Sequence, residues 1–239
     1  MTGLIRGELI KLRTTRTALG FGVGVALVTL AIVLITVLAG DPKTIPDKRS
    51  ALAVGSTISA LLLLFGVVGS GAEYRHRTLA PALLVAPARG RLLGSRIIAY
   101  ALAGLLIGLA MTALAFAVGL PLLSGQPGPS LRGVDYLRTV GGSLLTIVLT
   151  TVLGVGVGTL VGNQIAAVIG SLVWLFIIEP LSNLVGSTSK FTIGQTATAI
   201  TGDTGGQTLP WAAAVAVLLA WTLAFVVAAM LIDRRRDIS

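Results

Sequence analysis

The chain has 239 residues, of which 54% are hydrophobic and 11% are charged. An average soluble domain is about a quarter charged, so this composition excludes an ordinary soluble protein and indicates an exterior that faces lipid. The net charge of +9 raises the question of nucleic acid, but the charges are segregated between apolar blocks, so membrane topology explains them better. The chain contains no cysteine, which excludes disulfides and thiolate metal sites.

The first 17 residues combine apolar and basic side chains. Leu4, Ile5, Leu9 and Leu12 fall along one side of a helix, and basic residues spread over the rest: Arg6, Lys11, Arg13 and Arg16. This pattern is typical of a short amphipathic helix in the membrane interface. A basic flank that only sets the orientation of the chain explains it equally well.

Six apolar blocks follow and predict an all-α integral membrane protein with one transmembrane domain spanning residues 1–239. Each block has about 21–24 residues, enough to cross a hydrocarbon core of roughly 30 Å. The first is longer than the roughly 7–15 apolar residues of a signal peptide, so we interpret it as a retained spanning helix. The predicted spanning helices are 18–39, 51–72, 97–120, 140–161, 165–185 and 211–232.

The connections between the blocks add detail. Gly162, Asn163 and Gln164 separate the fourth and fifth blocks, which favours a tight helical hairpin over a single bent helix. Residues 40–50, 121–139 and 186–210 are the predicted outer loops. The third of these is apolar through 191–200, so we expect it to fold back rather than lie free.

The distribution of basic residues predicts the orientation. Of the 18 Lys and Arg residues, twelve lie in the N-terminal flank, in residues 73–96 or in the tail, which all fall on one side if there are six crossings. The excess places both termini and residues 73–96 in the cytoplasm, with the protein in the cytoplasmic (inner) cell membrane.

Residues 73–96 form the longest charged segment between two apolar blocks. Glu73 ends the second block, where its charge opposes the helix dipole, and Arg77 at i+4 would compensate it if the helix continues. Thr78 then caps a short second helix, and Pro87 ends it. An apolar ridge on that helix, flanked by arginines, would require a partner; it consists of Leu79, Leu83 and Leu84. An ordinary inside loop with a positive bias is the alternative.

No catalytic or metal site is visible. A phosphate-binding P-loop ends in Gly-Lys-Ser or Gly-Lys-Thr, and none of the four lysines follows a glycine. The single histidine, His76, lies in the charged loop without cysteine or a carboxylate pair, which makes zinc unfavourable. We therefore expect neither an enzyme nor a cofactor in this chain.

Residues 73–96 also resemble one known family, the permease subunits of type 2 ATP-binding-cassette exporters. Arg96 stands where the family commonly has Lys, and Arg77 departs from its frequent Gly. Residues 7–14 and 178–181 are similar to further parts of the family pattern. The matching positions in the loop are Glu73, Thr78, Leu79, Leu83, Leu84, Pro87 and Arg89.

The resemblance implies a cytoplasmic coupling helix between the second and third spanning helices that docks on a separate ATPase subunit. It implies that the partner subunit binds ATP and Mg²⁺, and that a second permease copy completes a homodimer or heterodimer. The resemblance implies outward transport across the lipid bilayer but gives no cargo; the apolar spanning blocks, with few polar groups, suit a hydrophobic or amphipathic one. A secondary carrier or channel without an ATPase, or a non-transporting scaffold or sensor subunit, are the alternatives. No nucleic acid partner is expected.

Two further features of the apolar blocks are candidate sites. Glu179, in the fifth block, is either an outer gate or cargo contact, or a helix-end carboxylate that reaches water or a backbone partner; we favour the second. Gly154, Gly158 and Gly162 recur at every fourth residue, which permits close helix approach. We prefer packing within the subunit to a dimer seam.

Overall fold

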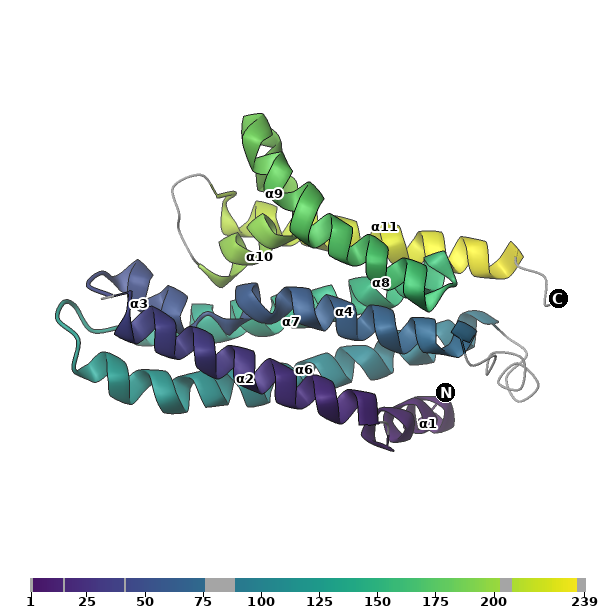
Figure 1. Cartoon of the computed structure of the whole chain (residues 1–239), viewed down its shortest axis with the longest axis horizontal. Coiled ribbons are helices and arrows are strands. Elements are labelled where there is room, and N and C mark those ends of the chain that lie inside the picture. The colour runs from purple at the N-terminus through teal and green to yellow at the C-terminus, as the bar shows by residue number, and fades with distance from the viewer. Residues whose placement is uncertain (1, 15, 41, 76–88, 203–207, 236–239) are drawn as a thin grey trace.

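The computed structural model describes residues 2–14, 16–40, 42–75, 89–202 and 208–235. Every regular element in these ranges is a helix, and the long helices run side by side along one axis (Figure 1). Six segments are long and apolar enough to cross a membrane, which confirms the predicted number and the helical class. They are Leu19–Leu38, Ile45–Arg75, Gly90–Ser124, Gly133–Val161, Gln164–Ser182 and Trp211–Asp233.

A short helix lies at each end of the bundle, α1 at one end and α3 at the other (Figure 1). Helix α1 and the end of α11 lie at one end, called the α1 end, and α3 lies at the other, called the α3 end (Figure 1). In chain order the elements are α1 (Thr2–Thr14), α2 (Arg16–Leu38), α3 (Ile45–Leu52), α4 (Val54–Arg75), α6 (Arg89–Ser124), α7 (Gly133–Val161), α8 (Gln164–Val173), the π-helical turn η1 (Trp174–Ile178), α9 (Glu179–Ser182), the 3₁₀ segment η2 (Asn183–Phe191), α10 (Ile193–Thr201) and α11 (Trp211–Arg235).

Several helices extend past the predicted apolar blocks. Helix α6 has 36 residues; it begins at Arg89 and continues one turn beyond Pro121. Helix α7 begins at Gly133, so the second outer loop is shorter than predicted. Hydropathy marks the part of a helix that lies in hydrocarbon, whereas the backbone hydrogen bonds continue into the polar zone.

Residues 40–50, predicted as a loop, contain most of helix α3. Thr44 caps the helix: its Oγ1 accepts from the Asp47 N–H at 3.3 Å, and its own N–H donates to Asp47 Oδ2 at 3.0 Å. Pro46 occupies the first turn, where its missing N–H costs nothing. The sequence Thr-x-x-Asp is the signature of such a capping box, and it was a detectable signal for this helix.

The predicted hairpin between the fourth and fifth spans is confirmed. Helix α7 ends at Val161, and the residue that follows, Gly162, has a left-handed φ of 66°, a conformation that favours glycine. The Asn163 side chain then caps α8 by accepting from the N–H groups of Ile165 and Ala166 at 3.0 and 3.2 Å.

Helices α4 and α7 form the centre of the bundle. In the spans that contain them, 67% and 56% of the most apolar window is buried, against 22% for the spans of α2, α6 and α11. Their backbones touch at glycines on both helices: a Cβ added to Gly66 or Gly154 would overlap the opposite backbone. Small residues allow this approach, and buried packing rather than a hydrophobic driving force then holds helices together in lipid.

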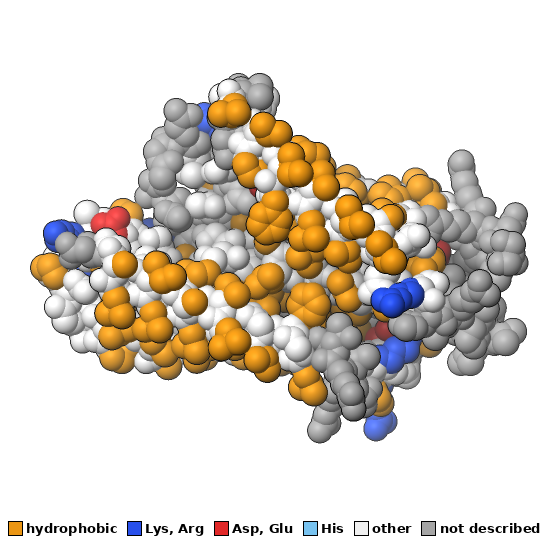
Figure 2. Space-filling model, viewed as in Figure 1, with side chains coloured by type: hydrophobic (Ala, Val, Ile, Leu, Met, Phe, Trp, Pro, Cys, Tyr) orange, Lys and Arg blue, Asp and Glu red, His pale blue; other side chains and the backbone are white. Residues whose placement is uncertain are grey.

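The fifth span is the least buried, with 11% of its apolar window covered. It leans away from the bundle towards α9, and hydrophobic side chains cover its exposed surface (Figures 1 and 2). The N–H of Glu179 donates to the carbonyl of Trp174, five residues back, and Pro180 follows directly. Helix α10, within the predicted third outer loop, packs on α4, α7 and α11.

Candidate functional site

Glu73 lies in the last turn of α4, at the α1 end, two residues before the described part of the chain stops. Glu73 is only 8% exposed. A carboxylate at a helix C-terminus opposes the helix dipole, and burial removes the water that would solvate it. Such a group must find cationic partners.

Two cations from distant parts of the sequence contact the Glu73 carboxylate. Arg96, in α6 and 2% exposed, donates from Nη2 to Oε2. Lys11 of α1 donates from Nζ to Oε1 at 3.1 Å and also to Glu8 Oε1 at 2.8 Å. Glu8, Lys11, Glu73 and Arg96 therefore form a charge-balanced group, called the ion cluster, that joins α1, α4 and α6.

The predicted partner of Glu73 was Arg77, which lies outside the described residues. Within the described residues, the compensation comes from Arg96 and Lys11, which lie 23 and 62 positions away in the sequence. Reasoning along a single helix considers neighbours at i+3 and i+4, so it could not find contacts that depend on how helices pack.

The ion cluster is costly to disrupt. Arg96 Nε is buried and has no hydrogen-bond acceptor among the described residues, so Glu73 provides the main compensation for the guanidinium. Removing one partner of a buried pair costs about 3–5 kcal/mol, because the other charge remains buried and uncompensated. The cluster thus fixes the relative position of α4 and α6 strongly.

Lys11 keeps its charge at physiological pH. Burial alone would lower the pKa of Lys11, but the hydrogen bond and charge of Glu8 and the charge of Glu73 outweigh burial and raise the pKa above its ordinary value. A raised pKa stabilises the folded form below the pKa of the unfolded chain, and this contribution is lost only as the pH rises through the higher folded value. The connection from α1 to Glu73 therefore persists through the neutral range.

An aromatic row continues from the ion cluster into the bundle. Tyr100 lies one turn after Arg96 on α6, with its ring centroid 5.4 Å from that of Phe65, which is 5.6 Å from Phe21. A Cβ added to Gly69 would overlap the Tyr100 hydroxyl, so this glycine lets the ring lie against α4. The row packs α2, α4 and α6 together directly beyond the cluster.

The same end of α4 also contacts two later helices. Tyr74 donates to Asp233 of α11 at 3.3 Å. Gln164, at the start of α8, donates to the Val68 carbonyl at 3.3 Å, and Arg75 donates to the Gln164 side chain at 3.5 Å. The end of α4 is therefore linked to α1, α6, α8 and α11.

Most of the predicted docking residues lie outside the part of the chain that the structure describes. Arg77, Thr78, Leu79, Leu83, Leu84 and Pro87 lie outside the described residues. Arg89 is the first residue of α6. The ends of the 73–96 segment are helical, since α4 continues to Arg75 and α6 begins at Arg89; the predicted docking helix itself stays a prediction.

Glu179 contacts the backbone at the opening of α10. Its Oε1 accepts from the Gly194 N–H, so a carboxyl oxygen lies at the positive end of a helix. A Cβ at Gly194 would come within 2.8 Å of Oε1, which makes this a close contact between the fifth span and α10. Glu179 thus has a structural partner; a gating or cargo role stays a prediction.

The recurring glycines of α7 face α4 in the same chain. A Cβ on Gly154 would overlap the Leu63 carbonyl, and one on Gly158 would overlap the Ser70 hydroxyl. Gly162 has a different role, because it ends α7 in a left-handed conformation. Helix α4 of the same chain therefore covers the α7 surface at Gly154 and Gly158.

A second group of buried charges lies at the α3 end. Lys48 donates to the carbonyls of Gln126 and Gly128 at 3.4 and 3.5 Å. Arg49 lies 3.9 Å from Asp135 of α7 and packs against Gly202. These contacts attach α3 to the α6–α7 connection and to the end of α10.

No protein-family model matches this chain, and no curated protein matches it.

Proposed function

We propose that this chain is the membrane-spanning permease subunit of an ATP-binding-cassette exporter. It lies in the cytoplasmic (inner) cell membrane with both termini in the cytoplasm. A separate ATPase subunit binds ATP and Mg²⁺ and docks on the segment between α4 and α6, and a second permease copy completes the transporter. The cargo is hydrophobic or amphipathic and moves outward. The family resemblance of residues 73–96 supports this assignment.

The ion cluster is the observation that carries the proposal. Helix α4 extends to Arg75 and α6 begins at Arg89, and the cluster joins these two helices two residues before Arg75 and seven residues after Arg89. A displacement of the segment would therefore move α4 and α6 together, and with them α1 through Lys11. Since α4 is central, such a displacement would reach the whole bundle. Rigid movement of packed helices is a known basis of alternating access.

Replacing Leu83 by Asp is expected to abolish co-purification of the ATPase subunit. Leu83 belongs to the predicted apolar ridge, and a buried interfacial carboxylate without a partner costs several kcal/mol. The candidate ATPase is a protein that is encoded by a neighbouring gene and that contains a phosphate-binding P-loop. The measurement is its recovery, per permease, on an affinity-tagged permease purified from membranes.

The matched control is Val134→Asp, which places the same charge on an exposed position of α7 at the α3 end. ATPase recovery with the control should equal that of the wild type. Equal recovery with Leu83→Asp would contradict docking at this segment. A purified permease that moves its cargo on an ion gradient, without any ATPase, would instead identify a secondary carrier.

A further inference from the structure

Helix α10 is a discrete element that packs on α4, α7 and α11, beside the leaning fifth span (Figure 1). It is separated from η2 by Thr192, whose backbone is extended at φ −71° and ψ 160°, and it stops at Gly202 in a left-handed conformation with φ 88°. Trp221 Nε1 donates to the Phe191 carbonyl at 2.9 Å, which anchors the chain just before this element. A movement of α10 would therefore leave η2 in place.

The threonines of α10 form their hydrogen bonds within their own segment. The hydroxyls of Thr196, Thr198 and Thr201 each donate to a carbonyl one turn earlier, at 2.9, 2.7 and 3.1 Å. These hydroxyls would stay paired if α10 left the bundle, so its separation exposes no unsatisfied donor among them. Ile193 and Ile200 supply its apolar contacts, in one buried cluster with residues of α4 and α7.

Two side chains from other elements meet the two ends of α10. At its start, Glu179 of the fifth span accepts a hydrogen bond from the Gly194 N–H. At its end, Arg49 of α3 lies so close to Gly202 that an added Cβ would overlap Nη2. The first N–H groups and the last carbonyls of a helix have no partner within it, and acceptors at the start and cations at the end are favourable. The fifth span and α3 thus hold α10 from opposite ends.

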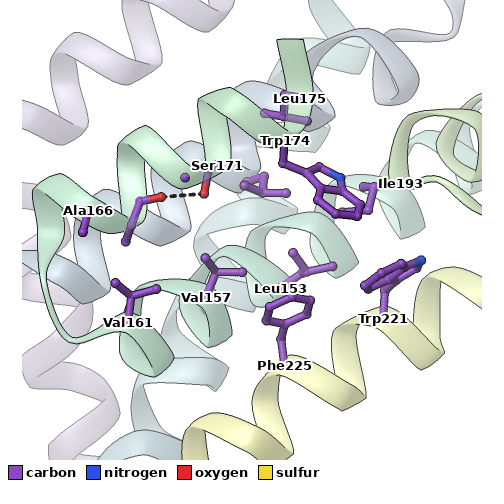
Figure 3. Close-up of a pocket in the computed structure, with 13 residues that line it drawn as sticks. Leu153, Val157, Val161, Ala166, Ser171, Trp174, Leu175, Ile193, Trp221 and Phe225 are labelled. Carbon is purple, nitrogen blue, oxygen red and sulfur yellow. Dashed lines mark hydrogen bonds between the residues drawn. The ribbon is translucent and has the colours of Figure 1, made fainter. Parts of the chain in front are cut away.

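The packing around the start of α10 is incomplete. Ile193 lines an apolar pocket of about 230 Å³ around Trp174, between the fifth span, α7 and α11 (Figure 3). A side chain that borders a cavity has no contacts on that side, so Ile193 fixes α10 less firmly than a fully packed residue would. The polar contact with Glu179 therefore provides a larger share of what holds this end in place.

The face of α7 beneath α10 contains an unsatisfied hydroxyl. Gly142 marks this face, because a Cβ there would overlap the Ile200 carbonyl. Thr146 lies one turn further along the same face of α7; it is 0% exposed, and its Oγ1 has no hydrogen-bond partner within the described ranges. Water that reached Thr146 would satisfy this hydroxyl. The closed position of α10 therefore carries a cost that its opening would relieve.

We propose that α10 is a lid that opens separately from the rest of the bundle, and that Glu179 at its start and Arg49 at its end hold it closed. Opening detaches α10 from α7 and admits water to Thr146. Folded proteins open locally where a unit has few ties to its surroundings. The proposal goes beyond the assigned function and requires neither an ATPase nor a cargo. A failure of ATPase docking and a failure of lid opening are therefore separate results.

The test uses a single thiol beneath the lid. The chain contains no cysteine, so Thr146→Cys introduces the only thiol, and its rate of reaction with a water-soluble methanethiosulfonate reagent is measured on the protein in lipid nanodiscs. Glu179→Leu removes the acceptor for the Gly194 N–H and should raise this rate about tenfold. Arg49→Met removes the cation but keeps an unbranched side chain, and should raise the rate about threefold.

Two controls separate lid opening from other effects. Glu179→Gln keeps the size of the side chain and an acceptor oxygen, so its rate should exceed the wild-type rate by no more than about threefold. Ala229→Cys, introduced in place of Thr146→Cys, is 0% exposed in α11; it reports unfolding of the bundle and should react slowly in every variant. An unchanged rate at position 146 with Glu179→Leu or Arg49→Met would overturn the proposal, as would equal acceleration at position 229 or by Glu179→Gln.

Discussion

Replacing Glu73 by Gln is expected to lower the free energy of unfolding by about 3 kcal/mol, because the buried Arg96 guanidinium loses its charged partner. The glutamine side chain retains one acceptor oxygen but not the charge. The neighbouring Arg96 Nε already lacks an acceptor, so the loss of the carboxylate leaves the guanidinium with still less compensation. The measurement is reversible unfolding of the purified protein in mixed micelles.

The double-mutant cycle with Arg96→Gln separates this interaction from other effects of the substitutions. Two neutral amides can hydrogen-bond to each other, so the double variant should be more stable than the sum of the single losses predicts, by about 2 kcal/mol. Additive losses would show that Glu73 and Arg96 do not stabilise each other. If the cluster also transmits movement, Glu73→Gln should retain the bound ATPase and lose ATP-driven transport.

Replacing Gly154 by Ala is expected to be nearly as damaging, at up to about 3 kcal/mol, because one methyl group would overlap the Leu63 carbonyl of α4. A backbone atom cannot rotate away, so α4 and α7 would have to separate along their contact. The folded, monodisperse fraction after extraction into detergent measures the effect, together with the unfolding midpoint.

Gly24→Ala is the matched control, because Gly24 is also helical and a Cβ there meets no atom within 4 Å. Alanine favours helix over glycine by about 1 kcal/mol, so this variant should be neutral or more stable. The same substitution thus has opposite expected signs at the two positions. Equal tolerance of both would contradict the close packing of α4 on α7.

The membrane spans were predictable from sequence because each span must satisfy its own backbone in lipid and be apolar over about 20 residues. The turn at Gly162 was predictable for a similar reason, since Gly and Asn mark it locally. The ends of α6 and α7 were not, because polar residues outside the hydrocarbon carry no hydropathy signal. Helix α3 has a local signal, the Thr44 capping box, which hydropathy overlooks.

The contacts of the ion cluster could not be predicted from neighbours along the sequence. Glu73 carries a charge that needs compensation, and among the described residues Lys11 and Arg96, from two other helices, provide it; the predicted contact with Arg77 stays a prediction. Both residues were visible as basic groups flanking spans, where the positive-inside bias explained them sufficiently. Their partner became evident only when α1, α4 and α6 were packed together. The pocket around Trp174 is similarly a product of packing between distant segments.

Photo-crosslinking in cells tests the central claim, that an ATPase engages the segment between α4 and α6, most directly. The photoreactive residue p-benzoylphenylalanine replaces Leu83 in one variant and Val134, at the α3 end, in the other. The account predicts that position 83 crosslinks to a cytoplasmic protein with a phosphate-binding P-loop and that position 134 does not. No crosslink to such a protein from position 83, or an equal one from position 134, would contradict it.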